Sequence, residues 1–312
     1  MDGRPTVEIM VSFPPAATEA EFRALTREDV LPAVVDLLGR ADVVPFTEGS
    51  LPVYAVGDDL VLKLYPPLYR DEVTTERTAL EVLHGVLPTP EPAGSGERDG
   101  WSWLLMRRLP GRTLNEAWPS LSPEDRQRLM PELGELLAAL HAVDDPRLAV
   151  LAPPDWAQFV AAQRENVVEH HRRTGLDEAW LAQIPGFLGT VELGTPTVVP
   201  LHTEFMRDHV MVDPDGRVTG LFDFEPAMRG AAEYDFAAVG LFVTGGDGDL
   251  MRRFLDGYGQ PVDPRRCLAY ALLHVYSDFT WYLDILPTPP EPTLDALAAA
   301  WWGTGSGQCA PQ

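Results

Sequence analysis

Short apolar runs fill the first third of the chain, and apolar residues at helical spacing fill most of the rest. Before residue 110, β-branched and aromatic side chains gather in runs that Gly and Pro separate. These runs predict strands at 53–56, 60–65 and 101–106. Gly57 and the two aspartates that follow it predict the turn that joins the first two strands into a hairpin.

Helical patterns flank these runs. Residues 19–38 predict a helix before the first strand. A second helical stretch, 72–83, is followed by Gly85 and Pro88, which are typical helix terminators.

After residue 110 the pattern is mostly helical. Ser122 is a typical N-cap residue, and Pro123 at the first helical position precedes leucines at helical spacing. Further helices are predicted at 155–172, 176–183, 232–243, 249–257, 264–284 and 293–301.

One β hairpin interrupts the helices. Strands are predicted at 210–212 and 218–222, and Asp215-Gly216 is a strong turn signal between them. We therefore expect an α+β fold with a small β-sheet lobe, residues 1–108, and a larger, mainly helical lobe, residues 109–312. The tail 303–312 is expected to fray, and a cleft between two such lobes is a natural ligand site.

Charge and composition limit the partners. The chain has 47 acidic and 24 basic residues, a formal net charge of -23. This disfavours nucleic acid and anionic membranes, because phosphate binding relies on clustered Lys and Arg. A negative field attracts cations, although acidity that only keeps the protein soluble is equally compatible. We expect a small-molecule partner and either a monomer or a homodimer.

Localisation follows from what the sequence lacks. No run approaches the ~20 apolar residues of a membrane span, and Met1–Pro5 has no apolar core of a signal peptide. Cys267 and Cys309 fit neither a disulfide framework nor a zinc spacing. We expect a cytoplasmic protein.

The segment 201–213 is the richest in reactive side chains. His202, Glu204 and His209 lie in a loop that enters the predicted hairpin, and Asp223 ends its return strand. Hairpin geometry brings the loop and Asp223 to the same end. Such an arrangement can hold a base and metal-binding oxygens around one reacting phosphate.

This segment resembles the catalytic loop of the aminoglycoside phosphotransferase and choline kinase superfamily, relatives of protein kinases. The family loop reads His-Gly-Asp, four residues, then Asn, and it enters a hairpin that ends in Asp-Phe-Gly or a similar triplet. Here His202 matches the His and Asp223 the second metal-binding Asp. Glu204 stands in place of the catalytic Asp, and His209 in place of the metal-binding Asn. Residues 233–237 look like the family's structural Tyr-Asp-Leu-Ala segment.

The resemblance extends into the first third of the chain and covers about residues 45–240 in order and spacing. It implies a two-lobed, protein-kinase-like fold. The strand 60–65 looks like the one that carries the phosphate-binding lysine. The implied nucleotide-binding residues are Gly49, Ser50, Lys63, Glu76, Met106, Arg107 and Leu109. Met106 would end the strand that leads into the hinge between the lobes. Residues 107–110 would present backbone groups to the nucleobase, which leaves ATP and GTP undistinguished.

The resemblance also implies roles for the remaining residues. Lys63 would hold the α- and β-phosphates while Glu76 fixes its position. Asp223 would hold Mg²⁺, and Glu204 would orient the substrate hydroxyl and accept its proton. His202 would bond to the loop backbone.

Two residues depart from the family pattern. Glu204 is one methylene longer than Asp, and His209 is a poor ligand for Mg²⁺, which prefers oxygen donors. Three alternatives stay open for the metal: Asp223 holds it nearly alone with waters, Asp208 contributes, or Mn²⁺ replaces Mg²⁺.

Acceptor-binding candidates lie on two predicted helices. They are Glu165, Glu169 and His170 on one, and Tyr276, Asp278, Trp281, Tyr282 and Asp284 on the other. Aromatic rings beside carboxylates suit a sugar that bears hydroxyls or amines. Amphipathic helices that pack their aromatic residues and expose their acidic residues to solvent would give the same pattern. The resemblance implies an antibiotic-resistance kinase of the hygromycin B phosphotransferase type. The acidic surface favours a cationic aminoglycoside, and a nucleoside antibiotic of the capuramycin type also fits.

Two further hypotheses remain. The departures at Glu204 and His209 are compatible with an inactive, kinase-like binder. Together with His202, these residues also match the two-His, one-carboxylate metal site of oxygenases. An enzyme of that kind would need Fe(II) and no nucleotide.

Overall fold

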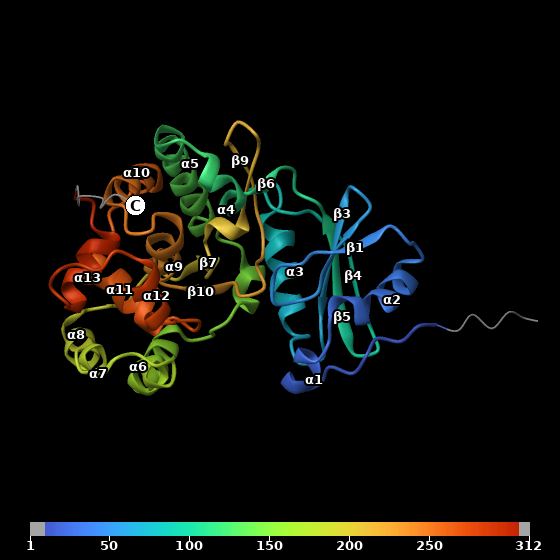
Figure 1. The fold of residues 1–312 in the computed structure, drawn as a ribbon, viewed down its shortest axis with the longest axis horizontal. Coiled ribbons are helices and arrows are strands. Elements are labelled where there is room, and N and C mark those ends of the chain that lie inside the picture. The colour runs from blue at the N-terminus through green and yellow to red at the C-terminus, as the bar shows by residue number, and fades with distance from the viewer. Residues whose placement is uncertain (1–9, 306–312) are drawn as a thin grey trace, which may run out of the picture. The chain divides into compact units, whose positions relative to one another are not determined.

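The computed structural model describes residues 10–305. The chain forms two compact units (Figure 1). One unit holds the described residues up to Glu81 together with Pro90–Arg108. The other holds Val82–Thr89 and the described residues from Leu109 onward, so the segment 82–89, expected in the first lobe, belongs to the second unit. Met1–Pro5, Cys309 and most of the tail expected to fray lie outside the described residues.

A five-stranded antiparallel sheet organises the first unit. The strand order is β1-β2-β3-β5-β4. The strands are β1 (Val43–Pro45), β2 (Val53–Val56), β3 (Leu60–Tyr65), β4 (Pro92–Arg98) and β5 (Trp101–Arg107). The predictions for 53–56 and 60–65 are confirmed at both ends, and 101–106 is confirmed with one further residue. The edge strands β1 and β4 were not predicted; β4 contains Pro and two Gly, residues that periodicity does not assign to a strand.

The helices of the first unit begin at capping motifs. The single helix predicted at 19–38 is two helices, α1 (Glu19–Arg23) and α2 (Arg27–Leu38), because Thr18 and Thr26 each cap a separate start. The prediction of α3 (Glu72–Leu83) is confirmed at both ends. Buried residues from α2 and the sheet form one core; among them are Val34, Tyr54, Leu62, Leu64 and Trp101.

The second unit is mainly helical. Its helices are α4 (Leu114–Ala117), α5 (Pro123–His141), α6 (Trp156–Arg173), α7 (Glu178–Leu181), α8 (Ile184–Thr190), α9 (Asp235–Ala238), α10 (Gly248–Tyr258), α11 (Pro264–Leu273), α12 (Phe279–Ile285) and α13 (Leu294–Trp302). Ser122 caps α5 by accepting the N–H of Asp125 (3.1 Å), as the sequence predicts. Within the described residues, no helix is both long enough and apolar enough to cross a membrane.

Several predicted helices of this unit are divided. The stretch 264–284 breaks between α11 and α12, where Asp278 caps the new start. The stretch 232–243 is a 3₁₀ turn, α9 and a π-helical turn, Val239–Val243. Helix α8 follows α7 and was not predicted.

Two small sheets carry the loop that the sequence singled out. The predicted hairpin is β8 (Val210–Val212) and β9 (Val218–Leu221), to which β6 (Arg112–Thr113) adds a third strand. Strands β7 (Val199–Leu201) and β10 (Met228–Gly230) form an antiparallel pair. The loop from β7 to β8 therefore has a strand at each end.

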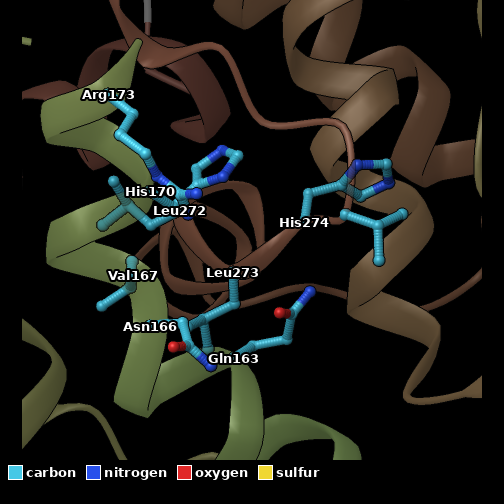
Figure 2. Close-up of a pocket in the computed structure, with 9 residues that line it drawn as sticks. Gln163, Asn166, Val167, His170, Arg173, Leu272, Leu273 and His274 are labelled. Atoms are coloured by element: carbon cyan, nitrogen blue, oxygen red, sulfur yellow. The ribbon is translucent and has the colours of Figure 1, made fainter. Parts of the chain in front are cut away.

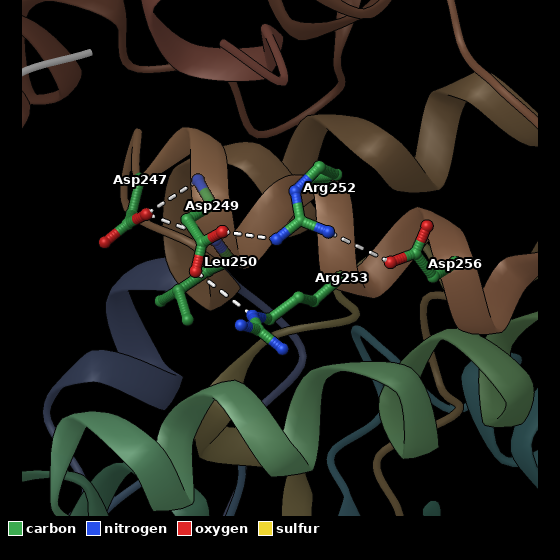
Figure 3. Close-up of polar contacts among 6 residues, drawn as sticks. All are labelled: Asp247, Asp249, Leu250, Arg252, Arg253 and Asp256. Atoms are coloured by element: carbon green, nitrogen blue, oxygen red, sulfur yellow. Dashed lines mark hydrogen bonds and ion pairs between the residues drawn. The ribbon is translucent and has the colours of Figure 1, made fainter. Parts of the chain in front are cut away.

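Helix α10 begins in a network of polar contacts (Figure 3). Asp247 accepts the N–H groups of Asp249 (2.9 Å) and Leu250 (3.1 Å). Arg253 contacts Asp249 at 3.1 Å, one helical turn away. The cap and the ion pair stabilise the start of a helix that lies along α5 (Figure 1).

Candidate active site

In the first unit, Lys63 and Glu76 form a buried ion pair. Lys63 lies on β3 and Glu76 on α3, and their side chains meet with Nζ 2.9 Å from Oε2. Tyr65 also donates its hydroxyl to Oε2 of Glu76. Lys63 is 6% exposed and Glu76 1% exposed. Because unpaired buried charge is costly, each residue fixes the position of the other.

The other nucleotide-binding candidates of this unit lie in a tethered loop and at the end of a strand. Arg27 donates to the carbonyl oxygens of Glu48 (2.8 Å) and Gly49 (2.6 Å), and Gly49 has a φ of 92°. Only glycine adopts such a φ without strain. Ser50 follows in the same exposed loop.

The predicted hinge is partly engaged in backbone hydrogen bonds. Met106 is buried in β5, and Arg107 donates its N–H to the carbonyl of Glu91 (2.8 Å). Arg108 donates its N–H to the carbonyl of Asp59 (2.8 Å). Leu109 belongs to the second unit. Because these N–H groups already have partners, fewer backbone groups are left to bind a nucleobase. The binding roles of these residues stay predictions.

In the second unit, a buried carboxylate holds the loop after β7. Asp235 accepts the backbone N–H groups of His202 (3.0 Å) and Thr203 (2.6 Å). His141 at the end of α5 contacts the same carboxylate, with Nε2 3.0 Å from Oδ2. The sequence identified the segment of Asp235 only as structural; the structure shows that its side chain anchors the loop.

Thr203 has an unusual backbone conformation. Its φ is 75°, a left-handed value that is costly for a β-branched residue. The hydroxyl of Thr203 donates to the carbonyl of Pro226 (2.8 Å), and Nε2 of His274 bonds to the carbonyl of Thr203 (3.2 Å). The motif that this loop resembles has Gly here, and the spacing of residues along the chain does not reveal the strain at this position.

At the end of the hairpin, His209 links the loop to Asp223. Its Nδ1 lies 2.9 Å from the carbonyl oxygen of Glu204, and its Nε2 lies 3.2 Å from Oδ2 of Asp223. A carbonyl oxygen only accepts hydrogen bonds, so Nδ1 carries a hydrogen. In a neutral ring, Nε2 then directs its lone pair toward the carboxylate, which suits a cation or a proton between the two.

The same residues form a candidate metal site. Glu204, His209 and Asp223 each offer a ligand atom, and these atoms lie within 4.8 Å of one another. Two carboxylates suit Mg²⁺, but an imidazole nitrogen does not. One nitrogen and two carboxylates fit Mn²⁺ better.

His202 takes no part in this cluster. Its Nε2 lies 2.9 Å from the carbonyl oxygen of Phe222, and the ring is fully buried. Burial lowers the pKa of His202 to about 4, so the ring is neutral at pH 7. Within the described residues, the ligand atoms that cluster with those of Glu204 and His209 come from Asp223 and not from His202. This is evidence against the oxygenase-type metal site, which would need His202.

A pocket of about 200 Å³ adjoins the loop, and Glu204 contributes to its wall. Trp281 and Tyr282 from α12 and Tyr276 from the preceding loop also line it. The lining does not include Glu165, Glu169, Asp278 or Asp284. The sequence could not tell which candidates line the pocket. Helical spacing shows which residues lie on the same face of a helix, but not which cavity that face borders.

A second pocket, of about 160 Å³, is lined by α6 and by the end of α11 with the two residues that follow it (Figure 2). Gln163, Asn166, His170 and Arg173 line it from α6. His170 contacts the carbonyl oxygen of Ser277 through Nε2 (2.7 Å). His274 lines both pockets.

The curated relatives are mostly kinases of small molecules. The chain is 26% identical over 167 residues to hygromycin-B 4-O-kinase of Escherichia coli, covering 49% of this chain and 47% of that protein. It is 24% identical over 225 residues to aminoglycoside 3'-phosphotransferase of Escherichia coli, covering 70% and 80%. It is also 23% identical over 218 residues to lysine-specific demethylase JMJ21 of Arabidopsis thaliana, covering 56% and 23%. The chain thus spans less than half the length of the first and the last of these.

Solved structures share the fold. The complex of a thermostable mutant of aminoglycoside phosphotransferase APH(4)-Ia with AMP-PNP and hygromycin B matches with a TM-score of 0.61 at 20% identity, covering 86% of this chain and 96% of that one. Macrolide 2'-phosphotransferase MphH of Brachybacterium faecium matches with a TM-score of 0.60 at 20% identity, covering 86% and 97%. Residues 42–270 match the phosphotransferase enzyme family. The chain belongs to this family.

Proposed function

We propose that the protein transfers the terminal phosphoryl group of ATP or GTP to a hydroxyl of a sugar-containing antibiotic. One observation carries the proposal: Glu204 both lines a pocket and shares a ligand cluster with His209 and Asp223. Phosphoryl transfer needs a base beside the acceptor hydroxyl and a metal site beside that base. The hygromycin, aminoglycoside and macrolide kinases among the relatives support this class of reaction.

In this reaction, each residue of the candidate active site has a distinct role. The acceptor oxygen forms a bond to the γ-phosphorus, the bond from that phosphorus to the bridging oxygen breaks, and the nucleoside diphosphate leaves. Glu204 accepts the proton of the hydroxyl. Lys63, held by Glu76, pairs with the α- and β-phosphates. A divalent cation held by Asp223 and His209 would neutralise charge on the phosphate oxygens.

A second candidate is a kinase-like protein that binds nucleotide and transfers nothing. The position of Nε2 of His209, 3.2 Å from Oδ2 of Asp223, favours it, because an imidazole nitrogen is a poor ligand for Mg²⁺. The demethylase relative suggests no third activity, since the match covers 23% of that protein.

The test is phosphoryl transfer to a panel of aminoglycoside, macrolide and nucleoside antibiotics, with ATP and GTP separately and with Mg²⁺ and Mn²⁺ separately. Mass spectrometry would detect a gain of one phosphoryl group, about 80 Da. Glu204→Ala should lose at least about 100-fold in kcat, as expected for loss of a general base. It should retain thermal stabilisation by nucleotide.

Glu178→Ala is the matched control, because Glu178 is an exposed carboxylate at the start of α7. Product formation by Glu204→Ala at the wild-type rate would contradict the assigned base. Nucleotide-dependent stabilisation without product from any acceptor would favour the inactive binder.

A further inference from the structure

The pocket beside Glu204 is walled mainly by apolar and aromatic side chains. Met206, Leu241, Phe242, Tyr276 and Trp281 line it together with Glu204. Trp281 stacks on Phe242 with ring centroids 5.5 Å apart and planes at 28°. Tyr276 is 56% exposed and Trp281 47% exposed. Large aromatic faces are therefore accessible beside the proposed catalytic base.

Acidic side chains at this pocket are few. Of the described carboxylates, only Glu204 and Asp208 line it. Glu204 is the proposed base, and Asp208 accepts a hydrogen bond from the side-chain amide of Asn115 (2.7 Å). A pocket built for several ammonium groups would need more carboxylates, because each buried cation requires its own partner.

The other acidic candidates do not line this pocket. Asp278 caps α12 by accepting the N–H of Trp281 (3.1 Å). Glu169 pairs with Arg172 (3.1 Å) on α6, and Glu165 is exposed on the same helix. The net charge of -23 can attract a cation from a distance, but it does not supply the contacts that recognise one.

We infer that the acceptor is a glycoside whose hydroxyl is carried on an apolar or aromatic scaffold with few positive charges, and not a polycationic aminoglycoside. The inference rests on the proposed function, since it assumes that the pocket beside Glu204 receives the acceptor. A flat or apolar scaffold would cover Trp281, Phe242 and Tyr276 and remove their faces from water. The sugar hydroxyl would then lie at Glu204.

Binding and transfer are measured separately. The probes are erythromycin, an apolar macrolide with one amino sugar; capuramycin, a nucleoside antibiotic; and kanamycin A, a sugar with several amines. Quenching of tryptophan fluorescence reports binding, and mass spectrometry with a common nucleotide reports transfer. We expect saturable binding of erythromycin or capuramycin at least tenfold tighter than that of kanamycin A, with the same order in kcat/KM.

The outcomes separate the two proposals. Binding in the expected order without transfer would support the preference of the pocket for apolar scaffolds and overturn the proposed function. Preferential binding and transfer of kanamycin A would overturn the inferred class and leave phosphotransfer intact. Failure of both erythromycin and capuramycin to bind would also overturn the inferred class.

Substitutions locate the binding surface. Trp281→Ala should raise KM for the preferred acceptor at least tenfold and leave KM for the nucleotide unchanged, and Trp281→Phe should restore most of the loss. Ile285→Ala is the matched control, because Ile285 lies on the same helix, is also 47% exposed, and is not among the pocket residues. Thermal melting checks that each variant folds. An increase of KM in Glu165→Gln or Glu169→Gln, with none in Trp281→Ala, would overturn the inference.

Discussion

The most informative single residue is His209. Its Nδ1 is fixed on the carbonyl of Glu204, and its Nε2 lies 3.2 Å from Asp223. A nitrogen in this position disfavours Mg²⁺ relative to softer divalent ions. We therefore expect the wild-type protein, with a non-hydrolysable nucleotide, to bind Mn²⁺ in preference to Mg²⁺.

Replacing that nitrogen with an amide oxygen tests this. His209→Asn should shift the ratio of Mn²⁺ to Mg²⁺ affinity toward Mg²⁺ by about tenfold, or about 1.4 kcal/mol. Electron paramagnetic resonance of bound Mn²⁺, with Mg²⁺ as competitor, measures the ratio without relying on activity. His84→Asn, at an exposed histidine, is the control. An unchanged ratio in His209→Asn would show that His209 is not a ligand.

Thr203 is the second residue whose conformation has a measurable consequence. A β-branched residue at a φ of 75° costs about 1–2 kcal/mol, whereas glycine has no such cost. Thr203→Gly relieves this strain but loses the hydrogen bond to Pro226. Thr203→Val keeps the strain and loses the same hydrogen bond. Urea denaturation should show Thr203→Val less stable than Thr203→Gly by about 1–2 kcal/mol, the cost of the strain; equal stability would contradict the argument.

The sequence predicts those parts of the site whose residues lie close together along the chain. His202, Glu204 and Asp223 were identifiable because their spacing lies within one loop and hairpin. The role of Asp235 as an anchor and the contact of His209 with Asp223 depend on side-chain directions, which spacing does not give. The pocket wall combines residues near 206, 242 and 281, and no local pattern predicts which faces of distant helices meet.

At the scale of elements, local signals set the predictions that succeeded. Strands β2 and β3 and helix α3 carry strong periodicity and clear terminators, and their bounds agree with the structure. The break between α11 and α12 has a tertiary origin. Val275 donates its N–H to the hydroxyl of Tyr234 (3.0 Å), and His274 bonds to the carbonyl oxygen of Thr203. A periodic sequence continues through such a break, so the prediction of one long helix there was wrong.

The contact between α5 and α10 depends on two glycines. A Cβ added at Gly257 would lie 2.0 Å from the carbonyl oxygen of Pro131, and one added at Gly134 would lie 2.1 Å from that of Phe254. Both neighbours are backbone atoms, so relief requires the helices to separate. We expect Gly257→Ala to lower the free energy of unfolding by about 1–3 kcal/mol.

Gly186→Ala is the matched comparison, because a Cβ at Gly186 in α8 meets nothing within 4 Å. It should raise stability by about 0.5–1 kcal/mol through helix propensity alone. Urea denaturation of both variants gives the comparison. A Gly257→Ala protein as stable as Gly186→Ala would mean that the two helices are not in close contact.

For the molecule as a whole, buried histidines couple stability to pH. His171, His202 and His274 are buried in the second unit, and burial lowers the pKa of each to about 4. The ordinary pKa of histidine in an unfolded chain is about 6.5. Between these values the unfolded chain binds protons that the folded protein does not, so stability falls as pH decreases through this window.

Urea denaturation between pH 7.5 and pH 5.5 tests this coupling above the range in which most carboxylates titrate. Each buried histidine should add a slope approaching about 1.4 kcal/mol per pH unit near the lower end. His171→Gln can keep a donor toward the carbonyl of Leu272, which His171 contacts at 3.0 Å. This variant should reduce the total slope by about one third, because one of three similar groups is removed. His84→Gln, at an exposed histidine, should leave the slope unchanged. A wild-type protein equally stable at both pH values would contradict neutral burial of these rings.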